Sequence, residues 1–335
     1  MRLSQIGELT LLAEIRKRFS KREKSIIVGI GDDGAVIEPS RFLRGQCPLV
    51  ATTDMMVEGV HFSLSFATPF QIGFKLISVN VSDIYAMGAT PHYALLNVSL
   101  KSDTDISNLY SFLDGIDNAL KLYKVSLVGG DLSSSPNGMT VSATLIGSVR
   151  KPLMRKGARV GNKIYVTGTL GDSAGGLYLL KKIKRPIVLH RPLNTPLRWD
   201  IMRPLLERHL MPFVRDPKSF LKSHATSMID ISDGLLIDLI RLCDESKVGA
   251  RIYEDKIPIS NELKSACIYL GLNPLQLALK GGEDYELLFS APFSRKINAV
   301  CIGEITRKER IIIDSKGKEL PIKPEGYKHF NETKG

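Results

Sequence analysis

The segment that decides the fold is residues 25–34, SIIVGIGDDG, where a short apolar run ends in a glycine loop with two adjacent aspartates. A β-type run that leads into glycines is typical of a strand followed by a tight loop. The same order, an apolar run, then Gly, Ser or Thr, then a carboxylate, recurs at Asp54, Asp131, Asp230 with Asp233, and Glu283 with Asp284. The sequence therefore predicts strands whose ends carry functional groups.

Helices are predicted between these strands. Thr68-Pro69 forms the cap and first position of a long helix that ends near Gly88. Other helices are expected over residues 9–19, 105–122 and 235–243 and from about residue 172, and a Pro-rich irregular region over residues 186–217. Further strands are expected over residues 48–52, 93–100, 125–128, 139–149, 163–166 and 285–290, with a strand-turn-helix unit starting at residue 228. This order predicts the α/β (α+β) fold class.

The boundary between two predicted domains lies near residue 150. Residues 150–157 form a basic stretch that contains Pro152, which is typical of a linker. A chain of 335 residues is long enough to bury two ordinary cores. We therefore expect an N-terminal mixed α/β domain over residues 1–150 and a C-terminal α/β domain over residues 151–335.

Composition excludes several classes of protein. Hydrophobic residues make up 43% and charged residues 24%, which is ordinary for a globular chain and leaves no room for a long disordered region. No apolar run reaches the length of a membrane span, and the first twenty residues carry no signal-peptide core, so a cytoplasmic protein without a membrane partner is expected. The four cysteines lack any paired spacing, so neither disulfides nor structural zinc are implied.

The formal net charge of +11 is compatible with an anionic small substrate, with nucleic acid or with an ordinary solvated surface. The basic residues come in small scattered groups, and no nucleic-acid-binding motif is visible. We therefore expect no nucleic-acid partner.

The acidic residues are more informative than the basic ones. An ionised carboxylate is costly to bury unless it is paired or binds a metal, and several carboxylates here lie in Gly-rich apolar segments. Asp83 stands out because it lies inside an otherwise apolar helix. Each aspartate alone could instead cap a helix or a turn. Together with nearby hydroxyls, and without accompanying His or Cys, they favour Mg²⁺, which indicates phosphate chemistry.

The familiar phosphate-binding motifs are missing from the sequence. There is no G-x-x-x-x-G-K-[ST] loop and no protein-kinase motif set. Residues 29–34 match G-x-G-x-x-G, and Asp54 follows at the distance expected of a dinucleotide-binding fold. We reject a nicotinamide-dependent oxidoreductase because two carboxylates in the loop would repel a pyrophosphate, and no long helix follows to receive it.

Ordered motifs cover nearly the whole chain. They are GIGDD at 29–33, TD at 53–54 with GVHF at 59–62, NVSD at 80–83 with AMGA at 86–89, GGD at 129–131, VTG at 166–168 with GDS at 171–173, IDISDG at 229–234 and GGEDYEL at 281–287. The set resembles the thiamine-monophosphate kinases, in the superfamily of aminoimidazole ribonucleotide synthetase. The resemblance implies ATP-dependent, Mg²⁺-dependent phosphorylation of thiamine monophosphate to thiamine diphosphate. It also implies a homodimer in which strands of both N-terminal domains form an intersubunit β-barrel.

The resemblance also implies the roles of individual residues. The Mg²⁺ ligands it implies are Asp33, Thr52, Thr53, Asp54, Asp83, Asp131, Asp230 and Asp233. The nucleotide contacts are Gly130, Asp131, Arg155 and Ser232, and the thiamine-phosphate contacts are His61, Glu283 and Tyr327. The aspartates expected to matter most for catalysis are Asp54, Asp83, Asp131 and Asp233.

One departure from the family concerns the C-terminal region. Members often carry an aromatic residue just before a final Gly-Tyr or Gly-Trp pair, whereas residues 323–325 are Lys-Pro-Glu here, so a ring contact either falls to Tyr327 or is missing. The alternative function is that of another ATP-using enzyme of the superfamily, similar to aminoimidazole ribonucleotide synthetase or selenophosphate synthetase. The latter would need a reactive cysteine in an N-terminal glycine loop, and Cys47 lies outside such a loop.

The predicted reaction needs no covalent intermediate. No Ser, Cys or His of the motifs is paired in the sequence with a base that would make it a nucleophile. An acceptor phosphate is already largely ionised at neutral pH. We therefore expect direct, in-line phosphoryl transfer.

Overall fold

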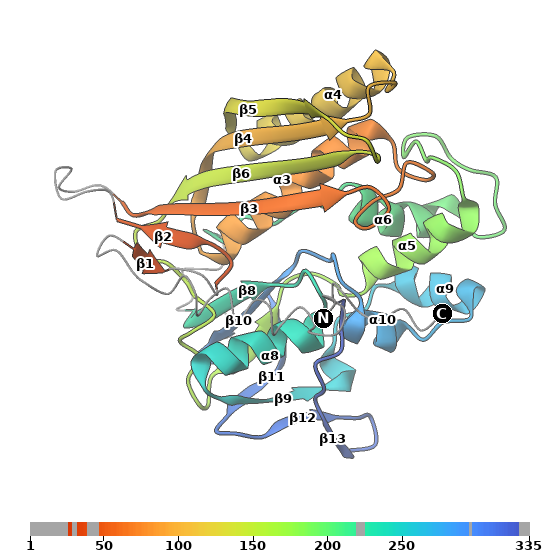
Figure 1. The fold of residues 1–335 in the computed structure, drawn as a ribbon. Coiled ribbons are helices and arrows are strands. Elements are labelled where there is room, and N and C mark those ends of the chain that lie inside the picture. Colours follow the sequence, from red (N-terminus) through yellow and green to blue (C-terminus); the bar gives the residue numbers. More distant parts are fainter. Residues whose placement is uncertain (1–25, 29–31, 39–46, 219–224, 295–296, 328–335) are drawn as a thin grey trace, which may run out of the picture.

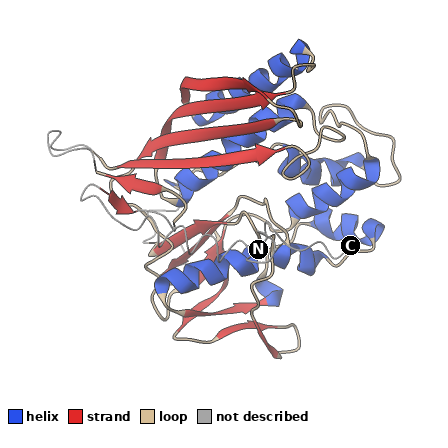
Figure 2. Ribbon diagram, in the orientation of Figure 1, coloured by secondary structure: helices blue, strands red, loops and turns tan. Residues whose placement is uncertain are grey.

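The computed structural model describes residues 26–28, 32–38, 47–218, 225–294 and 297–327. Within these ranges the chain forms two mixed sheets, one in each half, with helices between and beside them (Figures 1 and 2). The helix predicted over residues 9–19 lies outside the described residues. None of the described helices has both the length and the apolar character needed to cross a membrane.

The N-terminal sheet has six strands in the order β1-β2-β3-β6-β4-β5. Its pairs are antiparallel except for the parallel edge pair β4 and β5. The bounds are β1 Ile26–Val28, β2 Ala35–Ile37, β3 Leu49–Val57, β4 Thr90–Leu100, β5 Ser126–Ser134 and β6 Thr140–Ser148. Along β6 buried residues alternate with half-buried ones, because one face of the sheet packs on helices and the other does not. Figure 1 shows α3 and α4 on the covered face.

Helix α3, Pro69–Ala86, is the central element that both halves share. It starts at a capping box in which the Thr68 hydroxyl accepts a hydrogen bond from the Gln71 N–H and the Gln71 side chain accepts one from the Thr68 N–H. Most of its residues are buried, because the N-terminal sheet and α4, Ile106–Tyr123, pack on it and β8 of the C-terminal half also contacts it. The predicted helix from Thr68 to about Met87 is confirmed.

The C-terminal sheet has seven strands in the order β13-β12-β9-β11-β7-β10-β8. Their bounds are β7 Lys163–Val166, β8 Ser227–Asp230, β9 Gly249–Tyr253, β10 Leu287–Ala291, β11 Val300–Thr306, β12 Arg310–Ile313 and β13 Glu319–Pro321. The helices of this half are α5 Asp172–Ile183, α6 Trp199–Leu210, α8 Leu235–Ser246, α9 Asn261–Leu270 and α10 Pro274–Lys280, with a short 3-10 turn at Glu254–Lys256. The predicted strand over residues 163–166 and the strand-turn-helix unit that contains β8 and α8 are confirmed.

Three predictions of local structure are wrong. The strand predicted over residues 48–52 continues through Asp54 to Val57. Helix α6 forms where an irregular Pro-rich region was expected, because Met202, Leu205 and Leu206 are buried against neighbouring helices and Pro204 removes only one backbone donor. The third concerns Gly129-Gly130-Asp131, predicted as a loop after a strand. Strand β5 continues through it, and a Cβ at Gly130 would lie 1.9 Å from the carbonyl oxygen of Leu96 on the paired strand β4. Here glycine allows close strand packing rather than a turn.

Candidate active site

A cleft of about 740 Å³ lies between the two halves of the chain. The end of β3 and the loop after it, helices α3 and α5, and the loops around residues 232 and 283 all contribute side chains. The predicted site residues that line it are Asp54, His61, Asp83, Asp230, Ser232, Asp233, Glu283 and Tyr327. The fold therefore brings together side chains that are up to 273 positions apart, from Asp54 to Tyr327. We call this space the central cleft.

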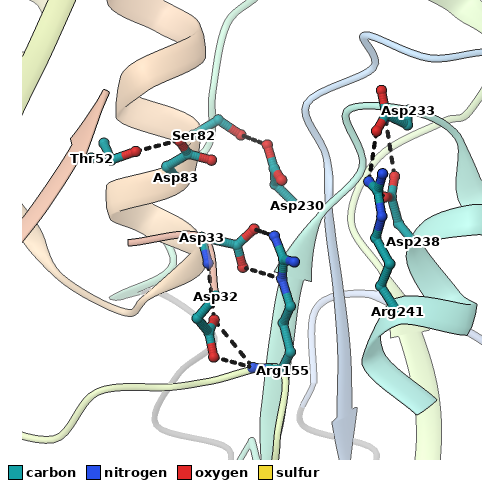
Figure 3. Close-up of polar contacts among 10 residues, drawn as sticks. All are labelled: Asp32, Asp33, Thr52, Ser82, Asp83, Arg155, Asp230, Asp233, Asp238 and Arg241. Carbon is teal, nitrogen blue, oxygen red and sulfur yellow. Dashed lines mark hydrogen bonds and ion pairs between the residues drawn. The ribbon is translucent and has the colours of Figure 1, made fainter. Parts of the chain in front are cut away.

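Three carboxylates meet at one end of the central cleft (Figure 3). One oxygen from each of Asp33, Asp83 and Asp230 lies within 4.8 Å of the other two. The Thr52 hydroxyl donates to Asp83 Oδ2 at 2.6 Å, and the Ser82 hydroxyl donates to Asp230 Oδ2 at 2.7 Å. The second of these bonds joins α3 to β8, so the aspartate cluster spans both halves of the chain.

The electrostatics of the aspartate cluster favour a bound cation. Burial, followed by repulsion from Asp54 and Asp230, raises the pKa of Asp83 well above its usual range. Burial and repulsion from Asp33 likewise raise the pKa of Asp230. The pKa of Asp54 rises to about 6 because of burial and the nearby Asp233 and Asp33. Close carboxylates of this kind repel one another until protons or cations neutralise them.

The two predicted threonine ligands point in opposite directions, because successive residues of a strand alternate between the faces of a sheet. The Thr52 hydroxyl lies at the aspartate cluster. The Thr53 hydroxyl instead donates to the carbonyl oxygen of Ala143 at 3.0 Å and contacts Thr144, on the neighbouring strand β6. The structure therefore does not bring the Thr53 side chain to the cluster.

Arg155 lies at the cluster and forms an ion pair with a predicted metal ligand. Its Nη2 donates to Asp33 Oδ1 at 2.7 Å, and its backbone N–H donates to Asp32 Oδ2 at 3.2 Å (Figure 3). Burial, with repulsion from Asp33, raises the pKa of Asp32 to about 7. The structure therefore places Arg155 beside a predicted metal ligand, and its predicted contact with the nucleotide stays a prediction.

Asp233 is held by residues of helix α8. Arg241 Nη1 donates to Asp233 Oδ2 at 2.6 Å and to Asp238 Oδ1 at 2.8 Å, while Asp238 Oδ2 accepts from the backbone N–H groups of Asp233 and Gly234 (Figure 3). Asp238, from within the first turn of α8, therefore fixes the preceding turn that presents Ser232 and Asp233 to the cleft. Arg241 and Asp238 were not predicted, although both follow the IDISDG motif closely.

Gly130 and Asp131 are not brought to the cluster within one chain. They lie on β5, the exposed edge strand, and β4 and β6 separate β5 from β3. With roughly 4.8 Å between neighbouring strands, this places Asp131 roughly 14 Å from Asp54 along the sheet. The expectation that Asp131 ends a strand is wrong, and the same expectation is wrong for Asp54, which lies inside β3.

At the other end of the central cleft, a glutamate lies beside basic and aromatic residues. Lys75 Nζ lies 2.7 Å from Glu283 Oε1, and His209 Nδ1 lies 3.2 Å from Glu283 Oε2. The His61 ring accepts a hydrogen bond from the Val57 N–H, and the Tyr327 N–H donates to the Asp233 carbonyl oxygen. Lys75 and His209 were not predicted. Lys75 carries the same signal as Asp83, since it is a charged residue in an otherwise apolar helix.

One serine is paired with a histidine, contrary to expectation. Ser173 Oγ lies 3.1 Å from His209 Nδ1, beside Glu283. Both partners contact the same ring nitrogen, whereas a nucleophilic triad uses both nitrogens of the ring. Ser173 is also fully buried at the start of α5. This geometry gives Ser173 no means of attacking a substrate.

Comparisons with known proteins place the chain in a family. The AIR synthase related protein N-terminal domain matches residues 31–149, and the corresponding C-terminal domain matches residues 159–316. The thiamine-monophosphate kinase of Aquifex aeolicus is 38% identical, over 98% of this chain and 100% of that protein. The enzyme of that name from Escherichia coli strain K12 is 34% identical, over 97% and 98%. A solved structure described as AaThiL complexed with AMPPCP and TMP has a TM-score of 0.83 at 36% identity, covering 98% of this chain and 99% of that chain.

The two domain matches and the two-sheet architecture define an AIR synthase related protein. Within that class, the near full-length relatives show which family the chain belongs to. The chain belongs to the thiamine-monophosphate kinase family.

Proposed function

We propose that this protein transfers the γ-phosphoryl group of ATP to the phosphate of thiamine monophosphate, which yields thiamine diphosphate and ADP. The observation that carries this proposal is that the two ends of the central cleft differ in chemistry. One end gathers Asp33, Asp83 and Asp230, and the other presents Glu283 beside His61 and aromatic side chains. The first end suits metal-bound phosphates, and the second suits a cationic heterocycle. The relative complexed with AMPPCP, an ATP analogue, and TMP supports the same pair of substrates.

The cluster fits Mg²⁺. Its donors are hard carboxylate and hydroxyl oxygens, and burial, together with repulsion from neighbouring aspartates, raises the pKa values of Asp83 and Asp230, which a bound cation would offset. Bound Mg²⁺ would neutralise charge on the phosphates and draw them together. The residues that would hold it are Asp33, Thr52, Asp54, Asp83, Asp230 and Asp233, together with Thr53 and Asp131 if backbone or intersubunit contacts bring them in.

The chain's own residues supply positioning rather than a nucleophile. An acceptor phosphate is largely ionised at neutral pH and needs little help from a base. The paired Ser173 and His209 are buried with the wrong geometry for attack, and the cluster aspartates would be engaged as ligands once a cation is bound. A direct in-line transfer is therefore the mechanism that the site supports.

The proposal includes a homodimer formed through the N-terminal sheet. Strand β5 leaves one edge unpaired among the described residues, and its apolar side chains Leu127, Val128 and Leu132 are exposed. Long apolar edges of this kind are normally covered. Pairing of this edge with a second copy would extend the sheet towards the predicted intersubunit barrel, and would supply Gly130 and Asp131 to a site that one chain does not complete.

The test is formation of ADP by the purified protein with Mg²⁺ and ATP in three parallel reactions. One contains thiamine monophosphate, one contains thiamine and one has no acceptor. ADP formation that requires thiamine monophosphate, with an equal amount of thiamine diphosphate, is the expected result. Equal turnover with thiamine, or turnover without an acceptor, would contradict the substrate assignment.

A further inference from the structure

A buried ion pair crosses the central cleft between the two halves of the chain. Lys75 lies on α3 and Glu283 lies in the loop between α10 and β10, with Nζ and Oε1 2.7 Å apart. The Lys75 side chain is only 5% exposed and the Glu283 side chain is 28% exposed, and both residues line the cleft. Most of the surface that this pair offers to the cleft therefore belongs to the carboxylate.

His209, on α6, holds the second carboxylate oxygen. Its Nδ1 lies 3.2 Å from Glu283 Oε2 and 3.1 Å from Ser173 Oγ. Burial, together with the nearby Lys75, lowers the pKa of His209 to about 3, so the ring is neutral. The uncharged His209 ring thus lies against the second carboxylate oxygen of Glu283.

The backbone of Glu283 is fixed as well. Its φ is 65°, in the left-handed region that non-glycine residues rarely adopt. Its N–H donates to the Ser232 carbonyl oxygen at 2.7 Å, which ties the loop to the turn that presents Asp233. Such a conformation persists where surrounding contacts determine it. Backbone and both carboxylate oxygens are therefore constrained together.

The constrained carboxylate still has acceptor capacity. Each carboxylate oxygen offers two lone-pair sites, and Lys75 and His209 use one on each. The partly exposed side chain can present the others to the cleft, whose walls at this end include Phe62 and Phe66. Burial by itself would raise the pKa of Glu283, but Lys75 lowers it below the ordinary value, so the group stays ionised.

We propose that Lys75 is a positioning residue for substrate recognition, which, with His209, holds Glu283 as an oriented carboxylate that receives the organic part of the acceptor, whose thiazolium ring is cationic and whose aminopyrimidine ring donates hydrogen bonds. This inference rests on the proposed function. Stability alone is a weak reason for the pair, because a buried ion pair contributes little net stability compared with apolar residues. Lys75 has little surface left for direct contact with the acceptor, because its side chain is only 5% exposed and its Nζ is paired with Glu283.

The test is a double-mutant cycle with Lys75→Met, Glu283→Gln and the double variant, with Lys75→Arg as the charge-preserving control. We expect Lys75→Met and Glu283→Gln each to raise KM for thiamine monophosphate about tenfold or more, since each weakens a charge-assisted contact. KM for ATP should change less than twofold. Titration with thiamine monophosphate in the absence of nucleotide should give the same ratios, and Lys75→Arg should recover part of the loss.

The decisive comparison is between Glu283→Gln and the double variant. If Lys75 acts through Glu283, the double variant has the same KM for thiamine monophosphate as Glu283→Gln, within twofold. The inference would be overturned if the KM of the double variant for thiamine monophosphate rose by the product of the two single-variant factors. It would also be overturned if KM for ATP rose as much as KM for thiamine monophosphate. This comparison remains valid if Lys75→Met alone fails to fold, since the double variant leaves no unpaired buried charge. A wild-type protein that does not phosphorylate thiamine monophosphate would refute the proposed function itself, before any variant is compared.

Discussion

Replacing Asp83 with Asn should stabilise the metal-free protein while it removes Mg²⁺ binding and activity. Two unit charges 4.8 Å apart repel by about 3 kcal/mol at an effective dielectric constant of about 20, and Asp83 lies within that distance of both Asp33 and Asp230. The raised pKa of Asp83 means that a bound proton already relieves part of this repulsion. We therefore expect a net gain of about 1–3 kcal/mol in a chelator. The Asn side chain keeps an oxygen that can accept from Thr52.

The assay is thermal unfolding of wild type and Asp83→Asn, each with chelator and with saturating Mg²⁺ and ATP. For a chain of this size, with about 2.1 cal/mol/K of unfolding entropy per residue, the gain corresponds to roughly 1–4 °C in Tm without metal. Mg²⁺ should raise the wild-type Tm clearly and the variant's Tm much less, and kcat should fall by about 10² or more. A variant that is no more stable than wild type in chelator, or that shows the full stabilisation by Mg²⁺, would refute the account of the aspartate cluster.

Three further outcomes are expected. Asp54→Asn and Asp131→Asn should each lower kcat by about 10² with Tm preserved, and near-normal turnover in both would contradict their assignment as ligands. Light scattering should give about twice 37.0 kDa for wild type and a monomer for Leu132→Arg, so an active wild-type monomer would exclude the intersubunit site. In chelator, Tm should fall as pH rises from about 4 to 7, because burial raises the pKa of Asp284 to about 7 and its folded-state proton is then lost. Asp284→Asn should flatten that dependence, and an unchanged slope would contradict it.

The parts of the fold that follow local rules could be predicted from the sequence. The start of α3 is set by Thr68, Pro69 and Gln71, whose capping contacts are formed within a few residues. The turn between β8 and α8 likewise depends on residues that are adjacent in the chain. Asp83 and Asp230 could be identified as candidate metal ligands because charged groups in apolar surroundings need a partner. The structure brings these two residues together.

The rest depends on contacts between segments far apart in the sequence. Gly130 was interpreted as a turn residue, but its small size is needed because the Leu96 backbone of β4 passes directly beside it. Helix α6 forms despite Pro204 because it packs closely against α5. A Cβ at Gly176 of α5 would lie 2.1 Å from the Leu205 carbonyl oxygen of α6. Lys75 gains its partner Glu283 only when the two halves meet. Periodicity and local motifs cannot predict such long-range contacts.

The central claim, direct transfer between ATP and thiamine monophosphate, is tested most directly by a single turnover with ATP labelled in its γ-phosphoryl group. The account predicts that the label appears in the terminal phosphate of thiamine diphosphate at the rate at which ADP forms, with none on the denatured protein. Label that is retained on the protein at a competent rate, or released only as inorganic phosphate, would contradict it.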